Sequence, residues 1–230
     1  MRLSAFHQRL VSGILPVCSR YGLVLAGEYA MKAHGLTDRP CEDLALVAAA
    51  DVPLREAAAA VAAACRAAGF AVTAAEADSR TGRLRVTEPE TGRTCTLDLA
   101  REALQWPPST CGDIAVLSLE DAAGLKVRAF HGYGMARDLI DVEAVGDLYS
   151  YRELERFARL HDEEFSLPEL VMRLEFADHI ADADFAAHGV DEERIRRIRR
   201  FAHAWAEDIK LRRRDDGDLD EADFDVPAID

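Results

Sequence analysis

Residues 23–47 of this chain read LVLAGEYAMKAHGLTDRPCEDLALV, in which two short apolar runs flank a segment with helical character. Leu23–Ala26 predicts a strand, Glu28–His34 predicts a helix and Asp43–Val47 predicts a second strand. Gly27 lies between the first strand and the helix. A glycine turn at a helix N-terminus can face a phosphate group, although one glycine does not define such a site.

The segments on either side of this stretch show the same mixture of helices and strands. Helical spacing predicts a helix over Leu3–Val17, which Pro16 should bend or end, and a second helix over Leu54–Ala68. Period-two alternation and turn residues predict three further strands, the last two forming an antiparallel hairpin: Phe70–Thr73, Arg83–Thr87 and Arg93–Leu99. This order predicts an α+β domain over residues 1–105, with a mixed sheet covered by helices mainly on one face.

The second half of the chain is predicted to be a helical domain over residues 106–214, after a linker at Trp106–Pro108. Ser118, Ser150 and Ser166 each begin a capping-box pattern that precedes an apolar helical stripe. A last long helix is predicted from Asp191 to about Lys210.

The composition places the chain among ordinary globular proteins. It has 230 residues, of which 49% are hydrophobic and 30% charged, and no apolar run approaches the length of a membrane span. The first residues lack the apolar stretch of a signal peptide, so a cytoplasmic location is expected. The five cysteines form no CxxC pair and the histidines no HxxxH spacing, which argues against structural zinc and favours reduced, buried thiols.

The charge is unevenly distributed along the chain. The formal net charge is −14, and residues 215–230 carry eight acidic residues without Lys or Arg. This segment is predicted to be a disordered, solubilising tail. The only dense basic stretch is Arg194–Arg200, with Lys210 and Arg212–Arg214 beyond it. It is either an RNA contact or the solvated face of a packed helix, and the isoleucines within it favour the second interpretation.

Strand alternation places two carboxylates on one face of the predicted sheet. Leu44 and Leu46 should point together toward the core, so Asp43 and Ala45 point the other way, and Asp98 takes the same outward face in the hairpin. Two carboxylates on adjacent strands could converge on a divalent ion. The alternative, which alternation alone favours, is that each Asp simply faces water.

The motifs resemble those of the AbiEii-type nucleotidyltransferases over roughly residues 20–150. That family has a Gly-Gly or Gly-Ser turn, a helix, and then Arg-x-Ser/Thr-x-Asp-x-Asp, which Gly27, Arg39 and Asp43 match. Lys126, followed by an Arg-Asp-x-x-Asp segment that ends at Asp141, resembles the family's later motif.

The resemblance implies a polymerase-beta-like nucleotidyltransferase fold followed by a helical domain. It implies transfer of a nucleotidyl group from an NTP to a hydroxyl of RNA or protein, with Mg²⁺ as cofactor and, in a toxin–antitoxin pair, an antitoxin protein as partner. The implied roles are metal binding for Asp43 and Asp98, nucleotide binding for Gly27, Arg39 and Lys126, and catalysis for Asp43 and Asp141.

Three residues depart from the family pattern. Ala45 replaces the second carboxylate of the Asp-x-Asp pair, Glu28 replaces the second residue of the glycine turn, and Cys41 replaces the Ser/Thr. Glu42 should point to the other face and so does not replace the missing carboxylate. Two further hypotheses therefore stand beside the enzyme: a catalytically inactive member that serves as a binding or regulatory module, and an unrelated α+β protein with an accidental match.

Overall fold

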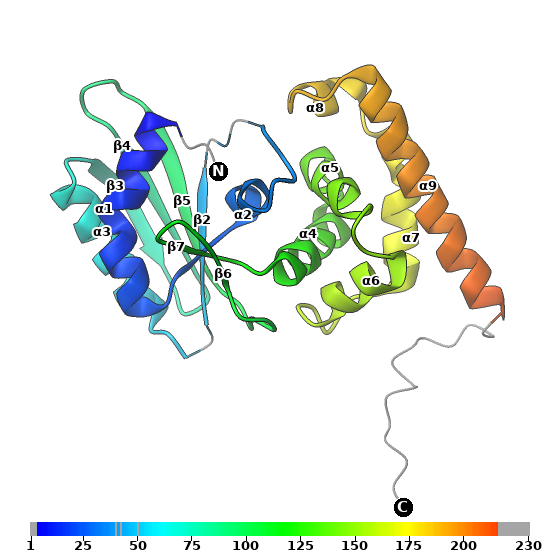
Figure 1. The fold of residues 1–230 in the computed structure, drawn as a ribbon, viewed down its shortest axis with the longest axis horizontal. Helices are drawn as coiled ribbons and strands as arrows, with labels where there is room; N and C mark the ends of the chain where they lie inside the picture. Colours follow the sequence, from blue (N-terminus) through cyan, green and yellow to red (C-terminus); the bar gives the residue numbers. More distant parts are fainter. Residues whose placement is uncertain (1–3, 40, 42, 50, 216–230) are drawn as a thin grey trace, which may run out of the picture. The chain divides into compact units, whose positions relative to one another are not determined.

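The computed structural model describes residues 4–39, 41, 43–49 and 51–215 of the chain, which divides into two compact units, Met1–Ala122 and Ala123–Asp230. The described strands are β1 (Val24–Ala26), β2 (Leu44–Ala48), β3 (Ala71–Ala77), β4 (Thr81–Thr87), β5 (Thr94–Arg101), β6 (Ser109–Cys111) and β7 (Ile114–Val116). The described helices are α1 (Ala5–Tyr21), α2 (Gly27–Ala33), α3 (Leu54–Ala67), α4 (Leu119–Tyr133), α5 (Ala136–Val145), α6 (Tyr151–Arg159), α7 (Leu167–Phe176), the 3₁₀ helix η1 (Ala177–His179), α8 (Asp182–Ala186) and α9 (Glu192–Asp215) (Figure 1).

The first unit is built on one mixed seven-stranded sheet with the order β3-β4-β5-β2-β1-β7-β6. β3, β4 and β5 are antiparallel neighbours, as the predicted hairpin required. β5 pairs with β2 in parallel, β2 pairs with β1 in an antiparallel manner, and β1 pairs with β7 in parallel. This arrangement confirms the predicted α+β fold class and places β1 and β2 in the middle of the sheet.

One face of this sheet is covered by α1 and α3, which pack against each other (Figure 1). The alternating residues Leu84, Val86, Cys95, Leu97 and Leu99 are all buried, whereas the residues between them in β4 and β5 are partly or fully exposed. The period-two pattern therefore assigned the two faces correctly. Helix α1 continues through Pro16 to Tyr21, where the prediction had the proline bending or ending it.

The boundary between the units differs from the predicted one. Residues 106–118 were predicted to open the helical domain, but β6 and β7 lie there and complete the sheet. Val116 pairs with Leu25 of β1, and the Leu117 N–H donates to the Leu25 carbonyl at 3.0 Å. The two strands have three residues each, too few for alternation to be visible in the sequence. The contact-based boundary falls inside α4, after Ala122.

The second unit is helical, and its predicted helix starts are confirmed. The Ser150 hydroxyl accepts from the Glu153 N–H, and the Glu153 carboxylate accepts from the Ser150 N–H at 2.8 Å, which completes a capping box. The Ser166 hydroxyl caps α7 by accepting from the Glu169 N–H at 3.3 Å. The stripe of α9, from Ile195 to Ile209, is buried as predicted. The predicted acidic tail lies outside the described residues, except that Asp215 ends α9.

In the described part of the chain, no helix is both long enough and apolar enough to cross a membrane.

Candidate functional site

The glycine turn between β1 and α2 lies directly against the central strand β2. Gly27 has φ +60°, a left-handed conformation that residues with a side chain adopt only with strain. A Cβ atom added to Gly27 would lie 3.2 Å from the Cβ of Ala45, whose backbone pairs with Ala26 across β1 and β2. The turn and position 45 are therefore in contact. Binding of a nucleotide by Gly27 stays a prediction.

We expect Gly27→Ala to lower the free energy of unfolding more than Gly35→Ala does, by about 1 kcal/mol. Both glycines have positive φ, but a Cβ at Gly35 would meet nothing within 4 Å, so the difference isolates the close approach to Ala45. Urea denaturation followed by circular dichroism measures it. Equal losses in the two variants would mean that the turn tolerates a side chain against β2.

Glu28, which follows Gly27 and departs from the family motif, forms an ion pair with Arg39, which matches the motif. Arg39 Nη2 lies 3.1 Å from Glu28 Oε1, and the Arg39 side chain is 9% exposed. Arg39 Nε donates to the Thr37 hydroxyl at 3.2 Å, and Lys32 Nζ donates to the Arg39 carbonyl at 2.8 Å. Glu28 thus neutralises Arg39, the guanidinium predicted to bind a nucleotide, and Arg39 in turn compensates the carboxylate beside the turn.

The two carboxylates predicted to hold a metal lie on neighbouring strands, but not side by side. Asp98 of β5 pairs in register with Ala45 of β2. Asp43 comes two residues before Ala45 and lies next to Thr96, whose N–H donates to Asp43 Oδ1 at 2.9 Å. Two residues along a strand correspond to about 6.5 Å, so the side chain nearest to Asp98 on β2 is the methyl group of Ala45.

Asp98 is already bound on both carboxylate oxygens. Arg83, its cross-strand partner on β4, donates from Nε to Oδ1 at 2.6 Å and from Nη2 to Oδ2 at 3.2 Å. Within the described ranges, no group of three or more His, Cys, Asp or Glu residues is placed to hold a metal ion, and Glu42 lies outside those ranges. Mg²⁺ is usually held by one or two carboxylates together with waters and substrate phosphates. A Mg²⁺ ion held by Asp43 and Asp98 therefore stays a prediction, and such an ion would have to displace Arg83 from Asp98.

The cysteines are free, as predicted, and burial affects the acidity of three of them. Burial, and after it the charge of Asp43, raises the pKa of the Cys95 thiol to about 12. Burial also raises the pKa of both Cys18 and Cys65 to about 11. These three thiols are therefore protonated at neutral pH and are not activated as nucleophiles.

In the second unit, the structure brings Lys126 of α4 together with two aspartates of α5. Lys126 Nζ lies 2.7 Å from Asp141 Oδ2 and 3.4 Å from Asp138 Oδ1. Burial alone would lower the pKa of Lys126, but the charges of Asp141 and Asp138 outweigh it and raise the pKa. The lysine stays charged and is held by two carboxylates. Its predicted role toward a phosphate, and that of Asp141 in catalysis, remain predictions.

Arg83 is the partner of Asp98 and the Thr96 N–H is the partner of Asp43, and no sequence motif pointed to either residue. The alternation of β4 already placed Arg83 and Arg85 on the outward face. What the sequence lacked was the cross-strand register, which pairs Arg83 with Asp98 and Arg85 with Thr96.

Comparison with known families agrees with the fold and the motifs. The model of the family described as "Nucleotidyl transferase AbiEii toxin, Type IV TA system" matches residues 19–225. This match covers most of the chain, and it excludes the hypothesis of an accidental motif. The chain matches none of the curated proteins by sequence.

Solved structures with a similar fold include proteins from two organisms. One is JHP933 from Helicobacter pylori, with a TM-score of 0.56 and 18% identity over 93% of this chain and 97% of that protein. The other is MenT4, a nucleotidyltransferase toxin from Mycobacterium tuberculosis, with a TM-score of 0.57 and 18% identity over 87% of this chain and 83% of that one. At such identity the likeness concerns the fold.

Proposed function

The chain belongs to the AbiEii nucleotidyltransferase toxin family, and we propose that it uses the family fold as a binding module rather than for efficient metal-dependent nucleotidyl transfer. It is a nucleotidyltransferase-like protein of a toxin–antitoxin family. The proposal concerns what this member does with that fold.

One observation carries the proposal: the residue opposite Asp98 on the neighbouring strand is Ala45. In metal-dependent transfer, carboxylates hold an ion against the nucleotide's phosphates, and the ion stabilises the charge that develops there. A methyl group supplies no ligand. Asp98 and Arg83 form an ion pair, which engages both oxygens of the Asp98 carboxylate.

The cationic groups expected to bind phosphate are also engaged within the protein. Arg39 is paired with Glu28, and Lys126 is paired with Asp141 and Asp138. A phosphate that bound to either cation would have to displace the carboxylate that is paired with it. This competition weakens nucleotide binding, because the existing pairs are broken before new ones form.

Active transfer is the second candidate, since Gly27, Asp43, Lys126 and Asp141 all keep the family's residue types. In that case an NTP is the donor, an RNA end or a protein hydroxyl is the acceptor, and Mg²⁺ is the cofactor. For either candidate we expect a cytoplasmic protein with an antitoxin partner, as in other toxin–antitoxin pairs.

The test is a transfer assay on the purified full-length protein and on Asp43→Ala. Each protein is incubated with every α-labelled NTP in turn, with Mg²⁺ or Mn²⁺ and total cellular RNA, and label is scored on RNA and on the protein. We expect the same background in both proteins. Label that wild type incorporates and Asp43→Ala does not would overturn the proposal and establish active transfer, provided that the variant melts cooperatively like wild type.

A further inference from the structure

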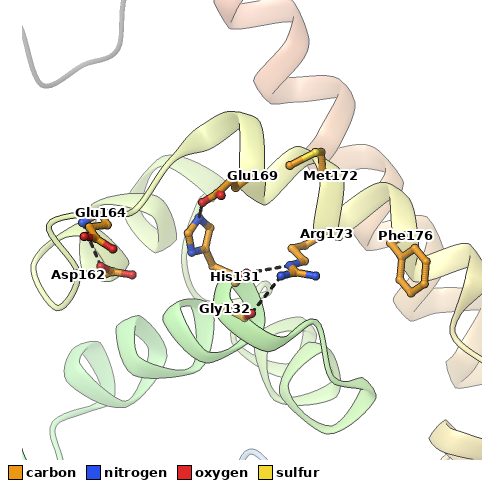
Figure 2. A pocket seen from close by; sticks show the side chains of 8 residues that line it. All are labelled: His131, Gly132, Asp162, Glu164, Glu169, Met172, Arg173 and Phe176. Atoms are coloured by element: carbon orange, nitrogen blue, oxygen red, sulfur yellow. Dashed lines mark hydrogen bonds and ion pairs between the residues drawn. The ribbon is translucent and has the colours of Figure 1, made fainter.

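The helical unit contains an open hollow of about 510 Å³ that none of the motifs discussed above occupies. It lies between the C-terminal end of α4, the connection from α6 to α7, and the exposed side of α7 (Figure 2). Its lining is chemically divided, with apolar side chains at one end and carboxylates at the other.

The apolar end is formed by two long side chains of α7. Met172 is 61% exposed and Phe176 is 54% exposed, and Figure 2 shows both on the same helix at one end of the hollow. Tyr133 and Met135 are also exposed, on the chain segment that continues from α4. That segment lies against α7, because a Cβ at Gly134 would be 3.3 Å from Cδ of Arg173.

These four residues are most of the large hydrophobic side chains that the described part of the chain exposes. The described part of the chain exposes seven large hydrophobic side chains, and four of them are Tyr133, Met135, Met172 and Phe176. Contiguous exposed apolar side chains with a polar rim are typical of surfaces that bind another molecule. Methionine side chains adapt their shape to a partner, which suits them to such a surface.

The opposite end is acidic. Asp162 and Glu164 lie in the connection between α6 and α7, and Glu169 lies in the first turn of α7 (Figure 2). The one guanidinium in the hollow, Arg173, donates from Nε to the His131 carbonyl at 3.0 Å and from Nη2 to the Gly132 carbonyl at 3.1 Å. Its charge is therefore directed at the carbonyl end of α4, which carries partial negative charge, and not at the carboxylates.

The floor of the hollow is held in place by packing and polar contacts. His131 is 7% exposed, and its ring lies 4.8 Å from the ring of Phe165. Its Nε2 atom lies 3.3 Å from the Ser166 N and 3.2 Å from Glu169 Oε2. The carboxylate of Glu169 therefore lies beside the floor of the hollow.

We propose that this hollow docks a segment of a partner protein that carries a lysine or arginine next to apolar side chains. The cationic group would lie at the end formed by Asp162 and Glu164, and the apolar side chains would cover Met172 and Phe176. Charge complementarity selects such a segment, since three carboxylates face one guanidinium that is already engaged.

Other occupants fit the hollow less well. The carboxylates repel the phosphates of a nucleic acid. The chain's own residues 215–230 include eight acidic residues and no Lys or Arg, so they are repelled as well. A second copy of the chain is distinguished by measurement. The proposal does not depend on whether the first unit transfers nucleotides.

The experiment selects a phage-displayed random dodecapeptide library against the immobilised full-length protein. Two matched pairs of variants then test the enriched peptides. Glu164→Lys is compared with Glu163→Lys, because both glutamates are exposed and adjacent but only Glu164 lines the hollow. Met172→Asp is compared with Leu148→Asp, which places the same charge on an exposed hydrophobic residue outside the hollow.

We expect the enriched peptides to combine Lys or Arg with apolar residues. Glu164→Lys and Met172→Asp should each weaken their binding at least about tenfold, while both control variants bind like wild type. No enrichment, acidic peptides, or equal effects of Glu164→Lys and Glu163→Lys would overturn the proposal. So would a dimer in light scattering that Met172→Asp converts to monomer, because the hollow would then belong to a second copy.

Discussion

Replacing Arg212 with alanine is expected to lower the free energy of unfolding of the helical unit by about 3–5 kcal/mol, because it leaves a buried carboxylate without its counter-charge. The carboxylate is Glu155 of α6, which is 1% exposed. Arg212 Nη2 lies 2.6 Å from Glu155 Oε1 and Nη1 lies 3.1 Å from Oε2, while the indole N–H of Trp205 donates to Oε1 at 2.8 Å. Urea denaturation followed by far-ultraviolet circular dichroism measures the change.

Two further variants make the interpretation specific. Arg214→Ala removes an exposed arginine from the same end of α9 and should change the free energy by less than about 0.5 kcal/mol. Glu155→Gln combined with Arg212→Ala should recover part of the loss, since the uncompensated charge is then gone. If Arg212→Ala is as mild as Arg214→Ala, the ion pair contributes little to the fold.

This ion pair also bears on the basic stretch of α9, which the sequence left open between an RNA contact and a solvated helix face. Arg197 Nε lies 2.6 Å from Glu143 of α5, and Arg199 Nη2 lies 2.7 Å from Asp182 of α8. With Arg212 these side chains join α9 to three other helices. Arg197, Arg199 and Arg212 therefore form ion pairs between helices of this unit. Neither interpretation of the sequence included this role.

A second large effect is expected at position 45, where this chain has alanine and the family pattern has a carboxylate. We expect Ala45→Asp combined with Arg83→Ala to bind Mn²⁺ at least about tenfold more tightly than wild type, which corresponds to about 1.4 kcal/mol. The first substitution places a carboxylate directly opposite Asp98, and the second releases Asp98 from its ion pair. Isothermal titration calorimetry with Mn²⁺ measures the affinity.

The matched control is Ala45→Asn with Arg83→Ala, which has the same shape without the negative charge. If both double variants bind Mn²⁺ alike, the added carboxylate does not reach the point where a metal would lie. The contact between Ala45 and Gly27 would then be the physical reason, because a longer side chain at position 45 has to turn away from the glycine.

Much of the fold followed from local patterns in the sequence. Alternation in β4 and β5 predicted which side chains are buried, since side chains of a strand point alternately to its two faces. Serine followed by glutamate three residues later predicted where α6 and α7 begin. The motif around Gly27, Arg39 and Asp43 predicted a family that the match over residues 19–225 confirms.

The partners of the site residues were decided only by the tertiary structure. Period two tells which face a side chain takes, but it does not tell which residue lies across from it, because register depends on how strands far apart in the chain are aligned. That alignment places Ala45 opposite Asp98 and Arg83 beside it. The pairing of Glu28 with Arg39 likewise depends on how the chain folds back after α2. The sequence determined which charged groups the sheet and the glycine turn carry, and the three-dimensional pairing determined that Asp98 is neutralised by Arg83 and Arg39 by Glu28.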